Sequence, residues 1–113
     1  MSRLPRLNRL LELEEDQRTP DGAGGYSTEW VGRGTHWAEL RPGYGRQREE
    51  ADASLASVRY RIITRASPSN APSRPRPGQR FRDGDRTFVI QAVSEFDSDA
   101  RYLTCFSTEE IST

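Results

Sequence analysis

The chain has few of the histidine and cysteine side chains that commonly act in catalysis or bind transition metals. The 113 residues include one histidine, His36, and one cysteine, Cys105. A catalytic histidine needs a carboxylate or nucleophile partner, and a structural zinc site draws on several histidine or cysteine ligands. We therefore predict no catalytic, cofactor or metal site. We expect His36 to be a packed or surface residue of a sheet, and Cys105 to be a small sheet or core residue.

Two other patterns match ligand sites only in part. Asp83, Asp85, Asp97 and Asp99 form two pairs at alternate positions. A calcium loop needs a longer series of ligands that ends in a glutamate, so we assign these aspartates to turns. The glycine-rich run at 22–25 lacks the lysine and the following helix of a phosphate-binding loop. Neither pattern predicts a ligand.

Arginine is the remaining candidate for binding chemistry. All 17 basic residues are arginines, and 17 acidic residues bring the net charge to zero. Such side chains can contact phosphates independently of nucleotide sequence, but pairing with the equally numerous carboxylates is the favoured interpretation. In a ring of subunits, each arginine would recur around the axis and form a belt of charge. Two clusters occur within short stretches: Arg3, Arg6 and Arg9, and Arg74, Arg76, Arg80 and Arg82.

The composition indicates a small core. Hydrophobic residues make up 33% of the chain, against about 45% or more in an average globular domain. A chain of this length fits one domain spanning residues 1–113, and an obligate assembly could supply burial that the subunit lacks. No apolar run approaches a membrane span or a signal peptide, and a single cysteine cannot form an intramolecular disulfide. We expect a soluble protein that is made in the cytoplasm and has no membrane partner.

The elements that would position these side chains are mostly strands. Residues 30–41 are expected to form one, because Ala38 and Leu40 alternate with polar or aromatic residues. Pro42 ends the strand, since proline cannot donate to a ladder. The polar residues 46–54 that follow favour a short helix.

Strand patterns and turn-rich segments alternate along the rest of the chain. Residues 4–15 fit either a helix or a strand. The Asp-Gly turn at 83–85 is a strong hairpin signal. Loop 66–77 should be stiffened by its prolines, whereas loop 16–27 is either a mobile arm that reaches a neighbouring subunit or a simple hairpin loop. We predict strands at 55–65, 79–82, 86–93 and 101–107, and an acidic turn at 95–100.

Together these segments predict a mainly β fold. It would be a small antiparallel β-barrel of five to six strands, with one short helix and two long loops. The flexible loops would span about 16–28 and 66–78, and the C-terminal residues 108–113 would be frayed. Closing the sheet into a barrel would also remove its exposed edges.

The order of these motifs resembles that of the phage head-tail joining proteins, also called head-closure or stopper proteins. The pattern W-x-x-x-x-x-x-W-A-E-L-R-P-x-x-G-R-Q begins at Trp30, and a later segment, G-x-x-F-x-x-x-x-x-x-F-x-I-Q-A-V, begins at Gly78. The resemblance covers nearly the whole chain and favours a first strand near 8–15. The residues that it marks as structural are Trp30, Trp37, Leu40, Pro42, Gly45, Arg46, Phe88 and Ile90.

This resemblance implies a structural protein and not an enzyme, located at the head-tail interface of a virion or phage-like particle. The subunit would form a ring with copies of itself, between an adaptor or portal-side ring and a tail terminator or tail tube. The ring would continue the DNA channel, which makes packaged double-stranded DNA a candidate partner. The candidate contacts to the channel or to neighbouring rings lie in or near the two loops: Arg18, Asp21, Tyr26, Arg74, Arg76 and Arg80.

A nucleic-acid-binding barrel is the alternative. Tyr60, Phe81 and Phe88, with nearby arginines, could form a surface on which single-stranded bases stack. The zero net charge counts against this alternative.

Overall fold

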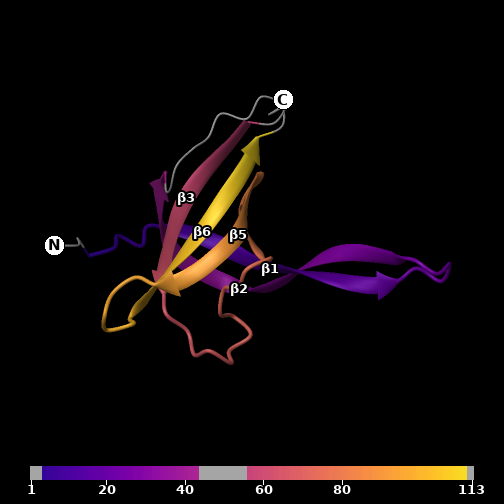
Figure 1. Cartoon of the computed structure of the whole chain (residues 1–113), viewed down its shortest axis with the longest axis horizontal. Helices are drawn as coiled ribbons and strands as arrows, with labels where there is room; N and C mark the ends of the chain where they lie inside the picture. Colours follow the sequence, from indigo (N-terminus) through magenta and orange to yellow (C-terminus); the bar gives the residue numbers. More distant parts are fainter. Residues whose placement is uncertain (1–3, 44–55, 112–113) are drawn as a thin grey trace.

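The computed structural model describes residues 4–43 and 56–111, and every regular element within these ranges is a β-strand (Figure 1). The segment that begins at Arg9 is a strand and not a helix, as the family resemblance predicted. The helix expected at 46–54 lies outside the described residues. The described part contains no helix that could cross a membrane. The strands are β1 (Arg9–Pro20), β2 (Tyr26–Pro42), β3 (Ala56–Arg65), β4 (Arg80–Asp83), β5 (Arg86–Glu95) and β6 (Tyr102–Ile111).

The six strands close into an antiparallel barrel in the order β1-β2-β3-β6-β5-β4. This confirms the predicted fold class. The short strand β4 forms the seam, since it lies between β5 and β1. Its pairing with β1 is limited to three residue pairs: Glu12 with Arg82, Leu13 with Phe81, and Glu14 with Arg80.

The core fills the barrel because alternate residues of each strand point inward. Phe81 and Phe88 face each other across the β4–β5 hairpin, and both are fully buried. Cys105 lies in the same core, as predicted, and burial raises the pKa of its thiol to about 12. The buried cluster consists of Leu11, Leu13, Ala38, Ile62, Phe81, Phe88, Ile90 and Cys105.

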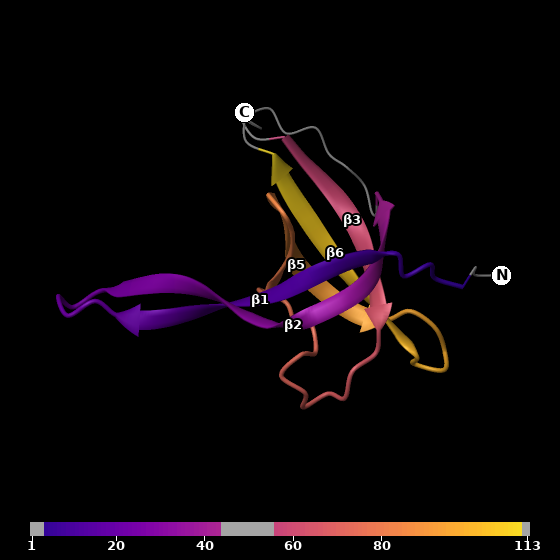
Figure 2. The same ribbon diagram turned by 180° about the vertical axis from the view of Figure 1, so that it is seen from behind.

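The outer parts of β1 and β2 leave the barrel together as a two-stranded ribbon (Figures 1 and 2). We call residues 16–30 the arm. The prediction of a flexible loop at 16–28 is wrong. The two strands stay paired along the arm, from the pair Asp16 and Trp30 to the pair Pro20 and Tyr26. Only residues 21–25 form the turn. The pairing of β1 with β2 begins beside the core. Backbone hydrogen bonds continue it into the arm, although the residues of the arm are of types common in turns.

The last strand is also longer than expected. Residues 108–113 were predicted to be frayed, but β6 continues to Ile111 and pairs with β3 as far as Ala56. The physical reason is a buried carboxylate: Glu109 is only 7% exposed and pairs with Arg86 of β5. Its burial anchors the end of the strand in the barrel wall. Residues 112–113 lie outside the described part.

Candidate functional site

Carboxylates and arginines pair across the seam between β1 and β4. The Glu14 side chain is largely buried and accepts hydrogen bonds from Arg80 Nε at 2.8 Å and from Arg82 Nε at 3.0 Å. Arg82 also donates to Glu12 at 2.6 Å, and its bonds to these two carboxylates raise the pKa of its guanidinium. These contacts confirm the expectation that many arginines pair with acidic residues of the same chain.

A second cluster lies at one end of the core, on the inner face of β3, β5 and β6, where Glu109 is paired with Phe88. Arg86 donates to both carboxylate oxygens of Glu109, at 2.8 and 3.0 Å, and to the hydroxyl of Tyr60 at 3.1 Å. The bonds from Arg86 hold the pKa of Glu109 below its ordinary value, which means that the carboxylate is the favoured form. This cluster is structural, since its hydrogen bonds join three strands.

The junction of arm and barrel is fixed by Trp30. The guanidinium of Arg80 lies 4.0 Å from the centre of the Trp30 ring, while the same side chain is bonded to Glu14. Stacking of this kind adds roughly 0.5–1 kcal/mol at a partly exposed site. Arg80, predicted as a channel or inter-ring contact, is therefore held between Trp30 and Glu14.

The loop between β3 and β4 is built around its own arginines. Arg76 donates to the backbone carbonyls of Ser69, Ala71 and Arg74 at 2.8–3.3 Å. Arg74 donates to the Ser67 carbonyl at 2.8 Å. The loop is thus held by its own hydrogen bonds. This agrees with the stiffness expected from its prolines and not with the flexible loop that was also predicted at about 66–78. The two guanidinium groups that were predicted to contact the channel or a neighbouring ring are used to hold the loop.

His36 fastens this loop to β2. Its Nε2 lies 2.7 Å from the carbonyl oxygen of Ser73, and its ring packs edge-on against Phe81. Burial lowers the pKa of His36, although the bond to Ser73 opposes the shift. Gly34 lies beside Ser73 with a φ of 121°, a conformation that favours glycine. His36 is a packed residue of the sheet, as predicted.

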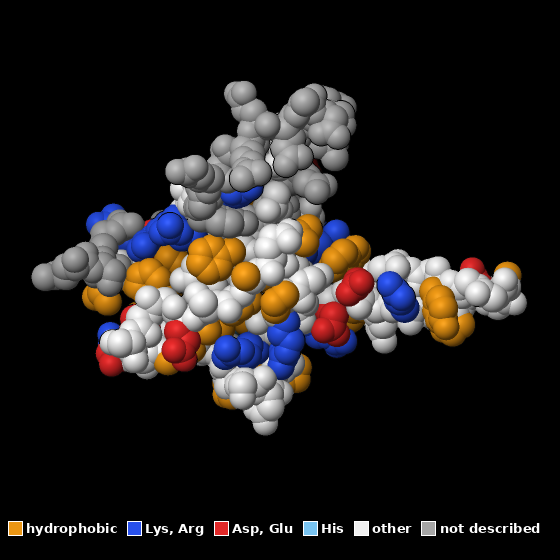
Figure 3. Space-filling view, in the orientation of Figure 1, with side chains coloured by type: hydrophobic (Ala, Val, Ile, Leu, Met, Phe, Trp, Pro, Cys, Tyr) orange, Lys and Arg blue, Asp and Glu red, His pale blue; other side chains and the backbone are white. Residues whose placement is uncertain are grey.

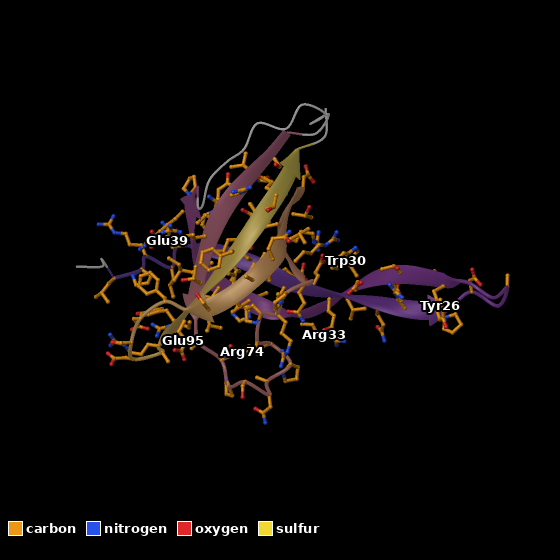
Figure 4. The ribbon with its side chains drawn as sticks, in the orientation of Figure 1. Tyr26, Trp30, Arg33, Glu39, Arg74 and Glu95 are labelled. Carbon is orange, nitrogen blue, oxygen red and sulfur yellow. The ribbon has the colours of Figure 1, made fainter. Side chains whose placement is uncertain are left out.

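The tip of the arm is the most exposed part of the candidate set. Tyr26 is 67% exposed (Figure 4), and Arg18 is exposed beside it. Asp21 instead closes the turn, because its Oδ1 accepts the amide hydrogens of Ala23 and Gly25 at 2.8 and 3.1 Å. These bonds lower the pKa of Asp21. Arg18 and Tyr26 are therefore available for contacts, whereas Asp21 shapes the turn that presents them.

The residues marked as structural by the family pattern fall into four groups. Leu40, Phe88 and Ile90 belong to the core or pack against it. Pro42 ends β2, as predicted, and Trp30 stacks with Arg80. Gly45 and Arg46 lie outside the described residues. Trp37 differs from the others, because it is 56% exposed on the outer face of the barrel.

The aromatic surface of the alternative hypothesis is not present. Phe81 and Phe88 are completely buried, and Tyr60 packs edge-on against Phe88 under Arg86. Bases cannot stack on rings that form the core. Within residues 4–43 and 56–111, no three histidine, cysteine, aspartate or glutamate side chains are grouped as metal ligands would be.

One surface was missed by the sequence interpretation. A shallow hollow of about 370 Å³ lies on the outer wall, lined by Leu7, Trp37 and Arg65. The signal was present in the predicted strand, where Trp37 falls on the same face as Glu39 and Arg41 and opposite Ala38 and Leu40. A tryptophan on the polar face of a half-buried strand indicates a contact surface.

Comparison with known proteins agrees with this architecture. The sequence matches the family described as phage head completion protein over residues 3–110. A chain in the solved structure titled "Virion of native gene transfer agent (GTA) particle" is 50% identical, with a TM-score of 0.83, and the match covers 97% of this chain and 100% of that one. No curated protein sequence matches. The predicted class, a structural protein of the head of a phage-type virion, is thereby confirmed. The chain belongs to the phage head completion protein family.

Proposed function

We propose that this subunit forms a ring in the head-tail connector, where it closes the filled head and joins it to the tail. The observation that carries this proposal is the match to a chain of a gene transfer agent virion over 97% of the length at 50% identity. Identity at this level over the whole chain supports the same place in a particle.

The architecture supports an assembly role. The barrel gives a rigid body without a free edge, and two elements, the arm and the loop at 66–78, project from it (Figures 1 and 2). The buried cluster is small, so contacts with neighbours would add to the stability of each subunit. Rigid bodies with projecting elements suit stacked rings, in which contacts both within and between rings are needed.

The proposed partners are copies of the chain, the adaptor or portal-side ring, and the tail terminator or tail tube. Packaged double-stranded DNA would pass through the lumen. Since Arg74, Arg76 and Arg80 hold their own loop or strand, Arg18 and Tyr26 on the arm are the stronger candidates for contacts between rings.

Electron microscopy of particles made with and without this gene product tests the proposal. We expect heads that fill with DNA but then leak it and lack tails when the chain is absent. Restoring the gene on a plasmid should restore tailed particles. Normal tailed, DNA-containing particles in the absence of the chain would contradict the proposal.

A further inference from the structure

An apolar row crosses the outer wall of the barrel. Leu10 of β1 is paired with Trp37 of β2, and both side chains are at least half exposed, at 50% and 56%. Arg65 of β3 and Leu7 lie beside Trp37 and line the hollow. Leu4, at 67% exposure, precedes this row. Apolar side chains gathered in this way on a polar barrel indicate a surface that another molecule covers.

The hollow has a positive rim. Arg65 is exposed and makes no ion pair within the part of the chain that the structure describes. Arg6, next to Leu7, is also exposed. A partner that fits this surface should therefore carry a large apolar or aromatic side chain flanked by carboxylates.

The arm has these properties. Register and alternation place Tyr26, Pro20, Arg18, Asp16 and Trp30 on one face of the ribbon. Across the whole arm, three carboxylates accompany a single arginine. In the space-filling view, hydrophobic and charged side chains alternate along the ribbon (Figure 3). The arm therefore has an exposed aromatic side chain, Tyr26, with Asp21 and Arg18 beside it, and a net negative charge over residues 16–30.

The arm and the hollow lie at opposite ends of the molecule. The N-terminal segment that leads to Leu7 extends to one side of the barrel, and the arm extends to the other (Figures 1 and 4). The longest dimension of the molecule is 55 Å. One copy cannot place its own arm in its own hollow, whereas two neighbouring copies can.

We propose that the arm of each subunit docks into the Leu7–Trp37–Arg65 hollow of the next copy of the same chain. The inference rests on the proposed ring and names the contact that forms it. Tyr26 packs against Trp37 and Leu7, and the carboxylate of Asp21 at the tip of the arm faces Arg65 and Arg6. The contact is head-to-tail. Such a contact closes into a ring when its rotation is a whole fraction of a turn, and every arm and every hollow is then occupied.

Site-directed cross-linking in assembled particles tests the contact. Ser27→Cys places a thiol next to Tyr26, and Asn8→Cys places one next to Leu7, so that the proposed anchors remain intact. The natural Cys105 is buried and stays unreactive. Particles whose chain carries both substitutions are treated with a short bis-maleimide. We expect a ladder of covalent multimers, because each copy is linked to the next.

Two controls separate the possible results. Ser27→Cys combined with Ser69→Cys, on the exposed loop, should give no ladder. Ser27→Cys alone should give no covalent dimer, and a strong dimer would mean that arms meet tip to tip and would overturn the proposal. If particles contain the chain and have normal tails but the Ser27–Asn8 pair stays uncoupled, the docking is wrong while the ring function stands. Absence of the natural chain from tailed particles would remove the proposed function itself.

A second measurement covers variants that fail to assemble. Tyr26→Ala and Trp37→Ala should each lower the amount of chain in purified particles several-fold, although circular dichroism shows that the isolated proteins are folded. Tyr26→Phe keeps the aromatic side chain, so this variant should be incorporated into particles at the natural level. Incorporation of both alanine variants at the natural level would overturn the proposal.

Discussion

At the residue scale, Glu109 is the clearest test of how polar side chains stabilise this barrel. It is nearly buried and takes two hydrogen bonds from Arg86, which hold its pKa below the ordinary value of 4.5. A group whose folded-state pKa is lowered stabilises the fold above its unfolded-state pKa, and this stabilisation is lost as the pH falls through the folded-state pKa. Glu109→Gln should therefore cost about 1–3 kcal/mol of unfolding free energy at neutral pH.

Chemical denaturation at several pH values measures this effect. The difference between Glu109→Gln and the natural chain should narrow as the pH falls below 4.5. Glu95→Gln, at an exposed position on β5, is the matched control and should leave the stability almost unchanged. A loss that does not depend on pH would mean that packing, not the charge pair, anchors the end of β6.

Cys105 gives a second prediction at this scale. Burial raises the pKa of its thiol to about 12, and only the thiolate reacts readily with disulfide reagents. We expect no reaction with an aromatic disulfide reagent at mildly alkaline pH in the folded protein, and one thiol per chain in denaturant. Absorbance of the released thiolate reports both states. Rapid labelling without denaturant would show that the barrel opens often around β6.

At the scale of elements, Arg76 should control the loop between β3 and β4. Its planar guanidinium reaches three carbonyls of the loop, a geometry that a lysine ammonium cannot reproduce. Arg76→Lys should lose about 1–2 kcal/mol of local stability, which speeds amide exchange in residues 66–78 roughly tenfold. Hydrogen exchange followed by mass spectrometry measures this change in exchange rate. Arg61→Lys, at an exposed position of β3, is the control, and equal exchange in both variants would contradict the role.

The elements that could be predicted from sequence are those with local signals. The hairpin of β4 and β5 followed from its Asp-Gly turn, and β3 followed from the alternation that ends in Ile62 and Ile63. The arm could not be predicted this way. Its residues contact no core, so no burial pattern marks them, and their strand conformation depends on the register set by Leu11 and Leu13.

The prediction that the end of β6 is frayed was wrong for a related reason. Thr108 and Glu109 are polar, and polar residues near a terminus are ordinarily frayed. The partner that buries Glu109 is Arg86, which lies 23 residues away in the sequence. A long-range pair of this kind is visible only once the fold has placed β5 beside β6.

At the scale of the whole molecule, the sequence indicated an assembly but not its contacts. Balanced charge and a low apolar content were read correctly as internal arginine pairing and a small core. Six candidate contacts were predicted in or near the two loops, and three of them, Arg74, Arg76 and Arg80, also form bonds within the subunit. The exposed Trp37 was assigned a structural role by resemblance. Its exposure depends on which face of β2 points outward. That face can be identified only once the sheet is closed into a barrel.

Removal of the arm separates folding from assembly. None of the buried cluster lies in the arm, and the seam at Glu12–Glu14 lies before it. Replacing residues 17–29 by Asn-Gly, which joins the paired Asp16 and Trp30 by a tight turn, should change the unfolding free energy by only about 1 kcal/mol. The shortened chain should nevertheless be missing from purified particles, and the heads should lack tails.

Denaturation of the purified protein and electron microscopy of the particles are to be read together. A shortened chain that is folded but does not assemble is the expected result, because the arm would carry contacts between subunits and not within one. A shortened chain that is unfolded would mean that the ribbon stabilises the barrel by itself. Tailed particles that contain the shortened chain would show that the ring is held by other surfaces, and the arm would then have no part in joining head to tail.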